Sequence, residues 1–283
     1  KNGVPYDPDV ILAELPNDRL QRYHVSAHCK KEKRFADDIS PTFGRHAEEH
    51  AHDQRQALRH RHAGRRARRR ALLSMIKPIQ SEANLRELFP QQSEMVIRKQ
   101  LIYLDKYCKR FIALSPFVCL ATSDSQGNVD VSPRGDAPGF VKVRDDKTLV
   151  LPDRRGNNRL DSLANVVANG HVGLLFLVPG IDETLRVNGT AEISDDPTLL
   201  ADHVVRGKTP IVALVVHVEE AFLHCAKAMI RSKLWAPKSQ VERGVLPGLG
   251  QMVAEQIAGR ELSDEDAAGA DAVIAKAYKD DLY

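Results

Sequence analysis

Residues 185–193 show the strictest alternation of apolar and polar side chains in the chain. The apolar positions of this segment are Leu185, Val187, Gly189, Ala191 and Ile193. A period of two residues is that of a β-strand, in which successive side chains point to opposite faces of a sheet. The segment therefore predicts a long strand with one apolar face.

Other segments also have strand character, and most are joined by short turns. Residues 124–128 contain Gly127 and Asn128, which tolerate the positive φ of a hairpin turn. The segment 172–178 is apolar on both faces, which favours a central or interfacial strand. The other predicted strands are 117–122, 129–131, 140–143, 148–151 and 211–218. Hairpins with few helices between them favour an antiparallel barrel over a doubly wound α/β sheet. We therefore expect a mainly β fold with flanking helices, of the α+β class.

Helical patterns flank these strands. Ser81 and Pro90 bound one predicted helix, and Gly170 stops another. The predicted helices are 81–90, 93–111, 158–169, 196–206, 224–235 and two within 248–282. We expect them to surround the sheet.

Residues 45–70 carry the positive charge of the chain. They contain nine arginines against three acidic residues, so the rest of the chain sums to −3 although the whole is +3. The segment has no lysine and no aromatic residue, which favours a disordered or non-native leader over residues 1–74. We expect translation to begin at or near Met75 and residues 75–283 to form the folded domain. A nucleic-acid arm acting through 45–70 remains the alternative.

Cysteine usage and hydropathy narrow the class of protein further. The four cysteines lie far apart without a C-x-x-C pair, which argues against a zinc site and a disulfide framework. No secretory segment is recognisable, and no apolar run reaches the roughly 18 residues of a membrane span. We therefore expect a cytoplasmic protein without a metal site.

Two basic clusters follow predicted strands, and they carry the main functional signal. The first is Ser132-Pro133-Arg134-Gly135-Asp136, and the second is Asp153-Arg154-Arg155-Gly156-Asn157-Asn158-Arg159. Guanidinium groups bind oxyanions in two places, and Gly or Asn lets backbone N–H groups approach them. With a helix expected from Asn158, Arg159 would lie at a helix N-terminus, which favours an anion. The clusters predict a phosphate site, with a pair of solvated turns as the alternative. The residues singled out are Ser132, Arg134, Gly135, Asp136, Arg154, Asn158 and Arg159.

A third set of candidates lies near the C-terminus. Lys227, Arg231 and Trp235 are spaced i, i+4 and i+8, so a continuous helix would place them on one face. Two cations and an aromatic ring would suit an anionic aromatic ligand. The alternative is an exposed basic face with Trp235 as a core anchor.

Five segments after about Ile79 carry a resemblance to a known family: 111–117, 132–140, 151–160, 183–189 and 224–235. Together they resemble the pyridoxamine 5′-phosphate oxidase-like, FMN-binding split-barrel family. The chain is most similar to the branch of probable FMN-dependent enzymes of unknown substrate. Residues 1–74 lie outside the resemblance.

The resemblance implies a six-stranded split barrel that forms a homodimer with two FMN sites at its interface. Residues 132–136 would line the flavin, and Arg159 would hold its phosphate. The strand containing Arg186 would lie near the site, as would Lys227, Arg231 and Trp235. The chain differs from true pyridoxamine phosphate oxidases, because Asn157-Asn158-Arg159 replaces their Ser-Arg-Lys run. The resemblance therefore supports FMN as the cofactor more strongly than it supports a pyridoxamine substrate.

The expected function is FMN-dependent oxidoreduction, in which a hydride or electron pair passes between a nicotinamide or small organic substrate and FMN. No catalytic protein residue is identified. The alternatives are a flavin-binding or storage protein without turnover, and an enzyme that uses deazaflavin or haem in the same barrel.

Overall fold

The computed structural model describes residues 77–280 and 282–283, which fall into two units, 77–91 and 92–283. The expected leader and Met75 lie outside the described residues. The first unit contains α3 (Glu82–Glu87), whose N-cap Ser81 accepts a hydrogen bond from the Asn84 backbone N–H at 3.2 Å. The predicted capped helix is therefore confirmed.

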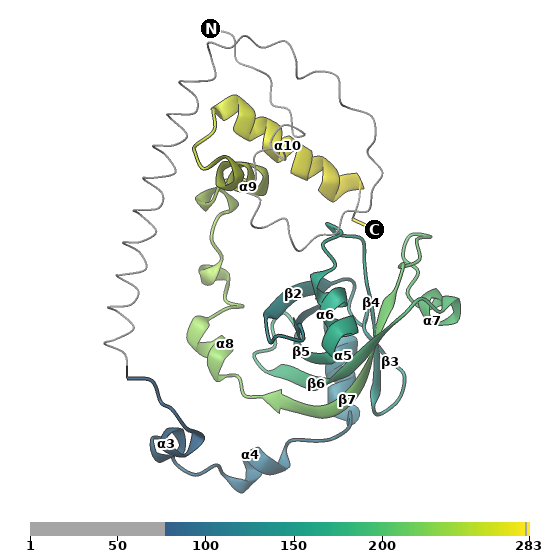
Figure 1. The fold of residues 1–283 in the computed structure, drawn as a ribbon, viewed down its shortest axis with the longest axis vertical. Coiled ribbons are helices and arrows are strands. Elements are labelled where there is room, and N and C mark those ends of the chain that lie inside the picture. Colours follow the sequence, from purple (N-terminus) through teal and green to yellow (C-terminus); the bar gives the residue numbers. More distant parts are fainter. Residues whose placement is uncertain (1–76, 281) are drawn as a thin grey trace. The chain divides into compact units, whose positions relative to one another are not determined.

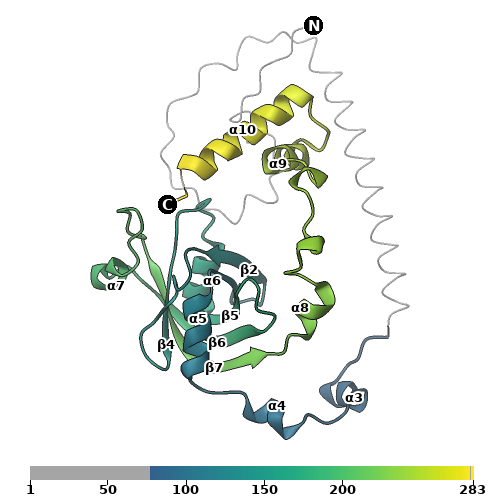
Figure 2. The same cartoon turned by 180° about the vertical axis from the view of Figure 1, so that it is seen from behind.

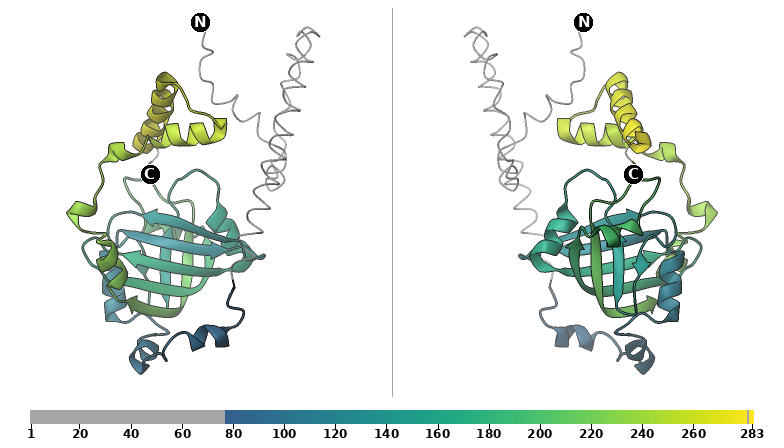
Figure 3. Two further views of the ribbon diagram at one scale, coloured as in Figure 1. Left: turned by 90° about the vertical axis from the view of Figure 1, so that its left-hand side faces the viewer. Right: turned by 90° about the vertical axis from the view of Figure 1, so that its right-hand side faces the viewer.

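The second unit is built on one antiparallel sheet (Figures 1 and 3). Its strands are β1 (Phe117–Ser123), β2 (Val129–Gly135), β3 (Lys142–Val143), β4 (Thr148–Pro152), β5 (His171–Leu177), β6 (Thr184–Ser194) and β7 (Ala213–His224). They follow the order β2-β1-β5-β6-β7-β4-β3, so β2 and β3 form unjoined edges. The expected antiparallel split barrel with flanking helices is confirmed, with seven strands in place of six.

The hairpin between β1 and β2 forms where the sequence predicts it. The Asp124 carboxylate accepts hydrogen bonds from the backbone N–H groups of Gln126 and Asn128, at 2.8 and 2.9 Å. Gly127 has φ +82°, which a glycine adopts without steric cost. The local side-chain chemistry thus determines this turn.

The core lies on the inner face of the sheet, where every second residue of the long strands is buried. Leu185 and Val187 of β6 are fully buried, as the alternation predicts. Each such side chain contributes about 1.5–3 kcal/mol to stability by leaving water. At the bulge beside Gly189, a side chain would overlap with the backbone oxygen of His217. Gly189 therefore allows β6 and β7 to approach each other.

The opposite, outer face of the sheet is apolar on β1, β2 and β5 but stays partly exposed. Strand register places Phe117 beside Leu177, and Cys119 beside Leu175. Phe117 is 37% exposed and Val131 is 60% exposed, although both lie in strands. This outer face thus lacks a covering layer within the described residues.

The predicted continuous helix over 93–111 is wrong. The chain instead forms α4 (Glu94–Arg98) and α5 (Lys106–Leu114), separated by residues that bridge to β7. Leu101 exchanges two backbone hydrogen bonds with Ala221, at 2.9 and 2.8 Å. Asp105 then starts α5 by accepting hydrogen bonds from Tyr107 and Cys108. Strand pairing and capping thus interrupt the helical pattern.

The helix expected from Asn158 begins later, as α6 (Asp161–Asn169). Asn158 and Leu160 have φ values of 56° and 58°, so neither can form part of a right-handed helix. Gly170 ends α6 with φ +77°, which confirms the predicted stop. Helices α5 and α6 lie against the sheet (Figure 2).

The remaining helices are shorter or later than the patterns indicate. α7 (Pro197–Ala201) ends before the tight turn at Val205–Lys208. β7 runs to His224, so the helix expected over 224–235 is reduced to α8 (Lys227–Ser232). Two 3-10 turns follow, η3 (Pro237–Ser239) and η4 (Arg243–Val245), and then α9 (Leu249–Ala258) and α10 (Asp264–Asp280).

The two predicted tail helices, α9 and α10, are confirmed, and they pack against each other. The Asp271 carboxylate of α10 accepts a hydrogen bond from the Gln251 backbone N–H in the first turn of α9, at 3.0 Å. A side chain at Gly248 or Gly250 would overlap with α10. Within the described residues, no helix is both long and apolar enough to cross a membrane.

Candidate cofactor site

The two basic clusters meet in the folded chain and exchange ion pairs. Arg134 at the end of β2 pairs with Asp153 after β4, and Arg154 binds Asp136 at 2.8 Å. β2 is one edge of the sheet, and β4 is the next-to-last strand at the other edge. Curling of the sheet therefore brings together residues that are far apart in strand order. We call these four residues the ion-pair cluster.

The ion-pair cluster is largely buried and electrically balanced. The side chain of Asp136 is 2% exposed, and the side chains of Arg134 and Arg154 are 18% and 17% exposed. Two guanidinium groups face two carboxylates, and the attraction between the opposite charges offsets the free-energy cost of removing them from water. The two carboxylates therefore already compensate part of the positive charge that we expected to bind a phosphate.

One donor in the cluster has no partner among the described residues. The Nε–H of Arg134 is buried without a hydrogen bond. Leaving such a donor unpaired costs about 1–3 kcal/mol, so a bound acceptor at this position would stabilise the protein. Arg154, by contrast, also donates from Nη1 to the backbone oxygen of His203 at 2.7 Å. An anionic ligand thus fits the cluster at Arg134 better than at Arg154.

Two residues near the cluster were not singled out as ligands by the sequence. The Tyr283 hydroxyl donates to Asp136 at 3.0 Å, and this hydrogen bond raises the pKa of the tyrosine. The imidazole of His203 is buried, and burial, followed by the charges of Lys142 and Arg154, lowers its pKa. Tyr283 is distant in sequence, and a single histidine carries no pattern, so no sequence signal marks either one.

The loop between β4 and α6 carries Asn158 and Arg159. The Arg159 side chain is 63% exposed and binds Asp161 at 2.8 Å, and its backbone N–H donates to Asn157 at 3.1 Å. Arg159 directly precedes the N-cap Leu160, so it lies just before α6 and not in the first turn of a helix that begins at Asn158. A role for Asn158 or Arg159 in holding phosphate stays a prediction.

Ser132, Arg134 and Gly135 lie on β2, and Arg186 lies on β6. The side chains of Arg134 and Arg186 point to opposite faces of the sheet. Register aligns Arg134 with Val118, then Phe176 and Leu185, which are all fully buried. Because strand side chains alternate, Arg186 points away from this row. Within one chain, Arg134 and Arg186 therefore do not share a site.

The C-terminal candidates are only partly on one helix. Lys227 and Arg231 are one turn apart on α8, but Lys233 ends that helix with φ +52°. Trp235 lies beyond the helix, so its predicted place on the same helical face is wrong. Its indole N–H donates to the backbone oxygen of Ile181 at 2.9 Å, as expected for an anchor.

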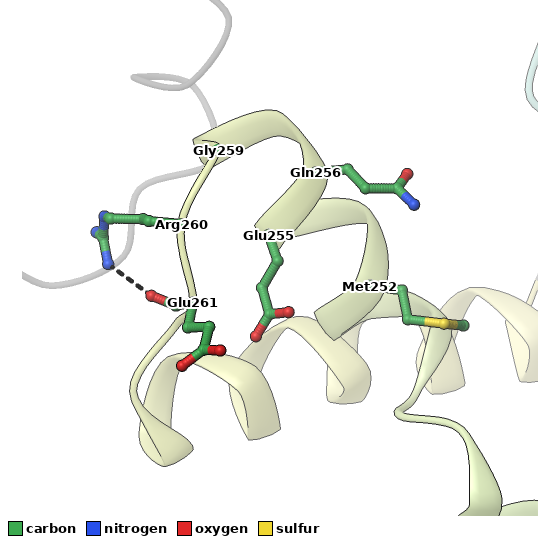
Figure 4. A pocket seen from close by; sticks show the side chains of 6 residues that line it. All are labelled: Met252, Glu255, Gln256, Gly259, Arg260 and Glu261. Atoms are coloured by element: carbon green, nitrogen blue, oxygen red, sulfur yellow. Dashed lines mark hydrogen bonds between the residues drawn. The ribbon is translucent and has the colours of Figure 1, made fainter.

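A separate hollow of about 410 Å³ lies beside the end of α9 (Figure 4). It is lined by Met252, Glu255, Gln256, Gly259, Arg260 and Glu261. The Glu255 carboxylate already accepts hydrogen bonds from Gln251 and the Leu262 backbone. No group of three potential metal ligands occurs among the residues that the structure describes.

Comparisons with known proteins find one matching family model and several similar solved structures. Residues 104–225 match the family model for pyridoxamine 5′-phosphate oxidase. A putative pyridoxamine 5′-phosphate oxidase from Lactobacillus delbrueckii is similar in structure, with 25% identity and a TM-score of 0.34 over 44% of this chain and 98% of its own.

Two further solved structures are similar over a comparable share of the chain. HupZ from Group A Streptococcus has 23% identity and a TM-score of 0.35, over 42% of this chain and 92% of its own. An FMN-binding protein from Syntrophomonas wolfei has 15% identity and a TM-score of 0.34, over 43% of this chain and 86% of its own. The search of curated proteins finds no match.

Proposed function

We propose that the protein is an FMN-dependent oxidoreductase, because residues 104–225 match the family model for pyridoxamine 5′-phosphate oxidase. The cofactor site is at the ion-pair cluster, where β2 and β4 end. The observation that carries this assignment is the buried, unpartnered Nε–H of Arg134 beside two reciprocal ion pairs. Such a donor suits the phosphate or another acceptor of FMN.

The residues of the chain would bind and orient the cofactor. Arg134 would donate to an acceptor through Nε, while Asp153 keeps its guanidinium in place. The ion pair between Arg154 and Asp136 would hold the ends of β2 and β4 together at the site. Arg159 would supply further positive charge from the loop between β4 and α6. FMN would supply the redox chemistry, exchanging a hydride or electron pair with a nicotinamide or small organic substrate.

A homodimer is part of the same proposal. The apolar outer face of β1, β2 and β5 leaves Phe117 and Val131 partly exposed, and a second copy could cover it. Lys227, Arg231 and Trp235 would then approach the partner's cofactor. Sedimentation equilibrium should give twice the chain mass, and Val131→Asp should shift the protein toward the monomer.

The absorption spectrum of the full chain, purified from its natural host, tests the cofactor assignment. FMN should give flavin bands and a fluorescence titration that saturates at one FMN per chain. Deazaflavin or haem bands, or colourless protein that takes up no FMN, would contradict the proposal. Stopped-flow mixing with NADH and NADPH then separates an enzyme from a storage protein. An oxidoreductase should show flavin reduction and substrate-dependent reoxidation, whereas a storage protein should not.

A further inference from the structure

Tyr283 is held by groups from three separate segments of the second unit. Its hydroxyl donates to the Asp136 carboxylate, just after β2, at 3.0 Å. Its ring lies over the guanidinium of Arg154, after β4, with the Cζ 5.8 Å from the ring centroid. The Arg206 Cζ lies 5.0 Å from the same centroid, and the Lys208 ammonium donates to the backbone oxygen of Tyr283. The hydroxyl, the ring and the backbone oxygen of this one residue are therefore each contacted by a charged side chain.

The contact is selective for the tyrosine. Leu282, the residue before it, is 56% exposed, and Tyr278 on α10 is 62% exposed. Tyr283, by contrast, is partly buried. Burial of apolar surface alone would favour Leu282, which is the more apolar residue. The polar contacts of the phenol ring therefore determine which residue docks.

The groups that contact Tyr283 are held in place by other parts of the chain. Asp136 binds Arg154 at 2.8 Å, and Arg154 also donates to a backbone oxygen at 2.7 Å. Val205 and Lys208 exchange two backbone hydrogen bonds, at 3.1 and 2.9 Å, which close the turn that carries Arg206. Because these contacts do not involve Tyr283, the site loses little conformational freedom when a ring binds to it.

We propose that Asp136, Arg154, Arg206 and Lys208 form a binding site for a small phenol that carries an acyl oxygen, and that Tyr283 occupies this site as an intramolecular ligand. The carboxylate accepts from the phenol hydroxyl, the two guanidinium groups lie against the ring, and the ammonium binds the acyl oxygen. A tethered ring competes at an effective concentration on the order of millimolar, so a free phenol binds only where it displaces Tyr283. The site borders the proposed cofactor site, because it shares two residues with the ion-pair cluster. Phenol binding does not require FMN, so this inference and the proposed function can fail separately.

The test compares the full chain with its Tyr283→Ala variant, which lacks the intramolecular ligand. The probe is N-acetyltyrosinamide, which has a phenol ring and an acyl oxygen, and its binding is followed by ligand-observed NMR. Tyr283→Ala should bind the probe saturably, and the unmodified chain should bind it at least about tenfold more weakly, because Tyr283 competes. Tyr278→Ala is the matched control, since it removes an exposed tyrosine of α10 and leaves the site occupied. This control should bind the probe as weakly as the unmodified chain does.

Two comparisons within Tyr283→Ala test the chemistry of the site. N-acetylphenylalaninamide lacks the hydroxyl that donates to Asp136, so it should bind about tenfold more weakly than the tyrosine probe. Adding Arg206→Gln removes one cation from the ring and should weaken the binding of both probes about threefold. Circular dichroism confirms that each variant is folded. Probe binding that does not saturate, that is equal in Tyr278→Ala and Tyr283→Ala, or that is equal for the two probes would overturn the proposal.

Discussion

Cationic side chains lie in opposite environments in the ion-pair cluster and on the outer face of β6 and β7, where Lys99 and Arg186 approach the ring of Phe222. In the first, Arg134 and Arg154 are largely buried and each faces a carboxylate. In the second, Arg186 and Lys99 are exposed and share the ring of Phe222. Buried paired charges hold a structure together, whereas unpaired exposed charges remain available to a solute. The difference separates a buried cluster of paired charges from exposed cations that have no carboxylate partner among the described residues.

The largest effect should come from breaking the more buried ion pair. Asp136→Ala leaves the Arg154 guanidinium largely buried without its carboxylate, so the free energy of unfolding should fall by about 3–5 kcal/mol. Urea unfolding measures this change. The control is Asp146→Ala, which breaks an exposed pair with Lys109 and should cost under about 1 kcal/mol. If both substitutions lowered the free energy of unfolding by the same amount, the buried ion pair would contribute no more to stability than the exposed one.

The next effect concerns the cofactor. Arg134→Gln removes the buried Nε donor, so FMN affinity should fall by about ten- to a hundredfold. Fluorescence titration measures the affinity, with Lys106→Gln as a control on another element. If Arg134→Gln bound FMN with unchanged affinity, the assignment of the cofactor to the ion-pair cluster would be wrong.

A smaller effect should depend on pH through His203. Burial lowers the pKa of this imidazole in the folded protein below its ordinary value of 6.5. The unfolded chain therefore binds the proton first as the pH falls, and stability present above pH 6.5 is lost as the pH drops toward the folded pKa. Urea unfolding at several pH values should show a shallower acid decline in His203→Gln. The same decline in both proteins would assign the effect to other groups.

The smallest effect should come from Tyr283→Phe. The substitution removes one hydrogen bond to Asp136 and keeps the ring near Arg154. Unfolding free energy should decrease by about 1 kcal/mol or less, as for a typical partly exposed hydrogen bond. A loss comparable to that in Asp136→Ala would mean that Tyr283 is essential to the cluster.

The sheet could be predicted from sequence because its signals are local. The alternation in 185–193 gave the buried face of β6, and Asp124 with Gly127 gave the first hairpin. The start of α6 could not be predicted, because the left-handed backbone of Asn158 and Leu160 has no distinctive residue pattern.

The candidate site was predictable in part. The two basic clusters were recognised as one site, but their reciprocal pairing with Asp136 and Asp153 depends on how the sheet curls. The contact between Tyr283 and Asp136 joins residues 147 positions apart, with no local signal. The separation of Arg186 from Arg134 likewise follows from strand register, which single residues do not reveal.

A crystal structure of the protein grown with FMN would test the central claim most directly. We expect the FMN phosphate or another acceptor of the cofactor to lie within hydrogen-bonding distance of Arg134 Nε, with the Asp153 and Asp136 ion pairs retained. FMN bound at Lys99 and Arg186, with Arg134 Nε still unpartnered, would contradict the assignment of the cofactor to the ion-pair cluster.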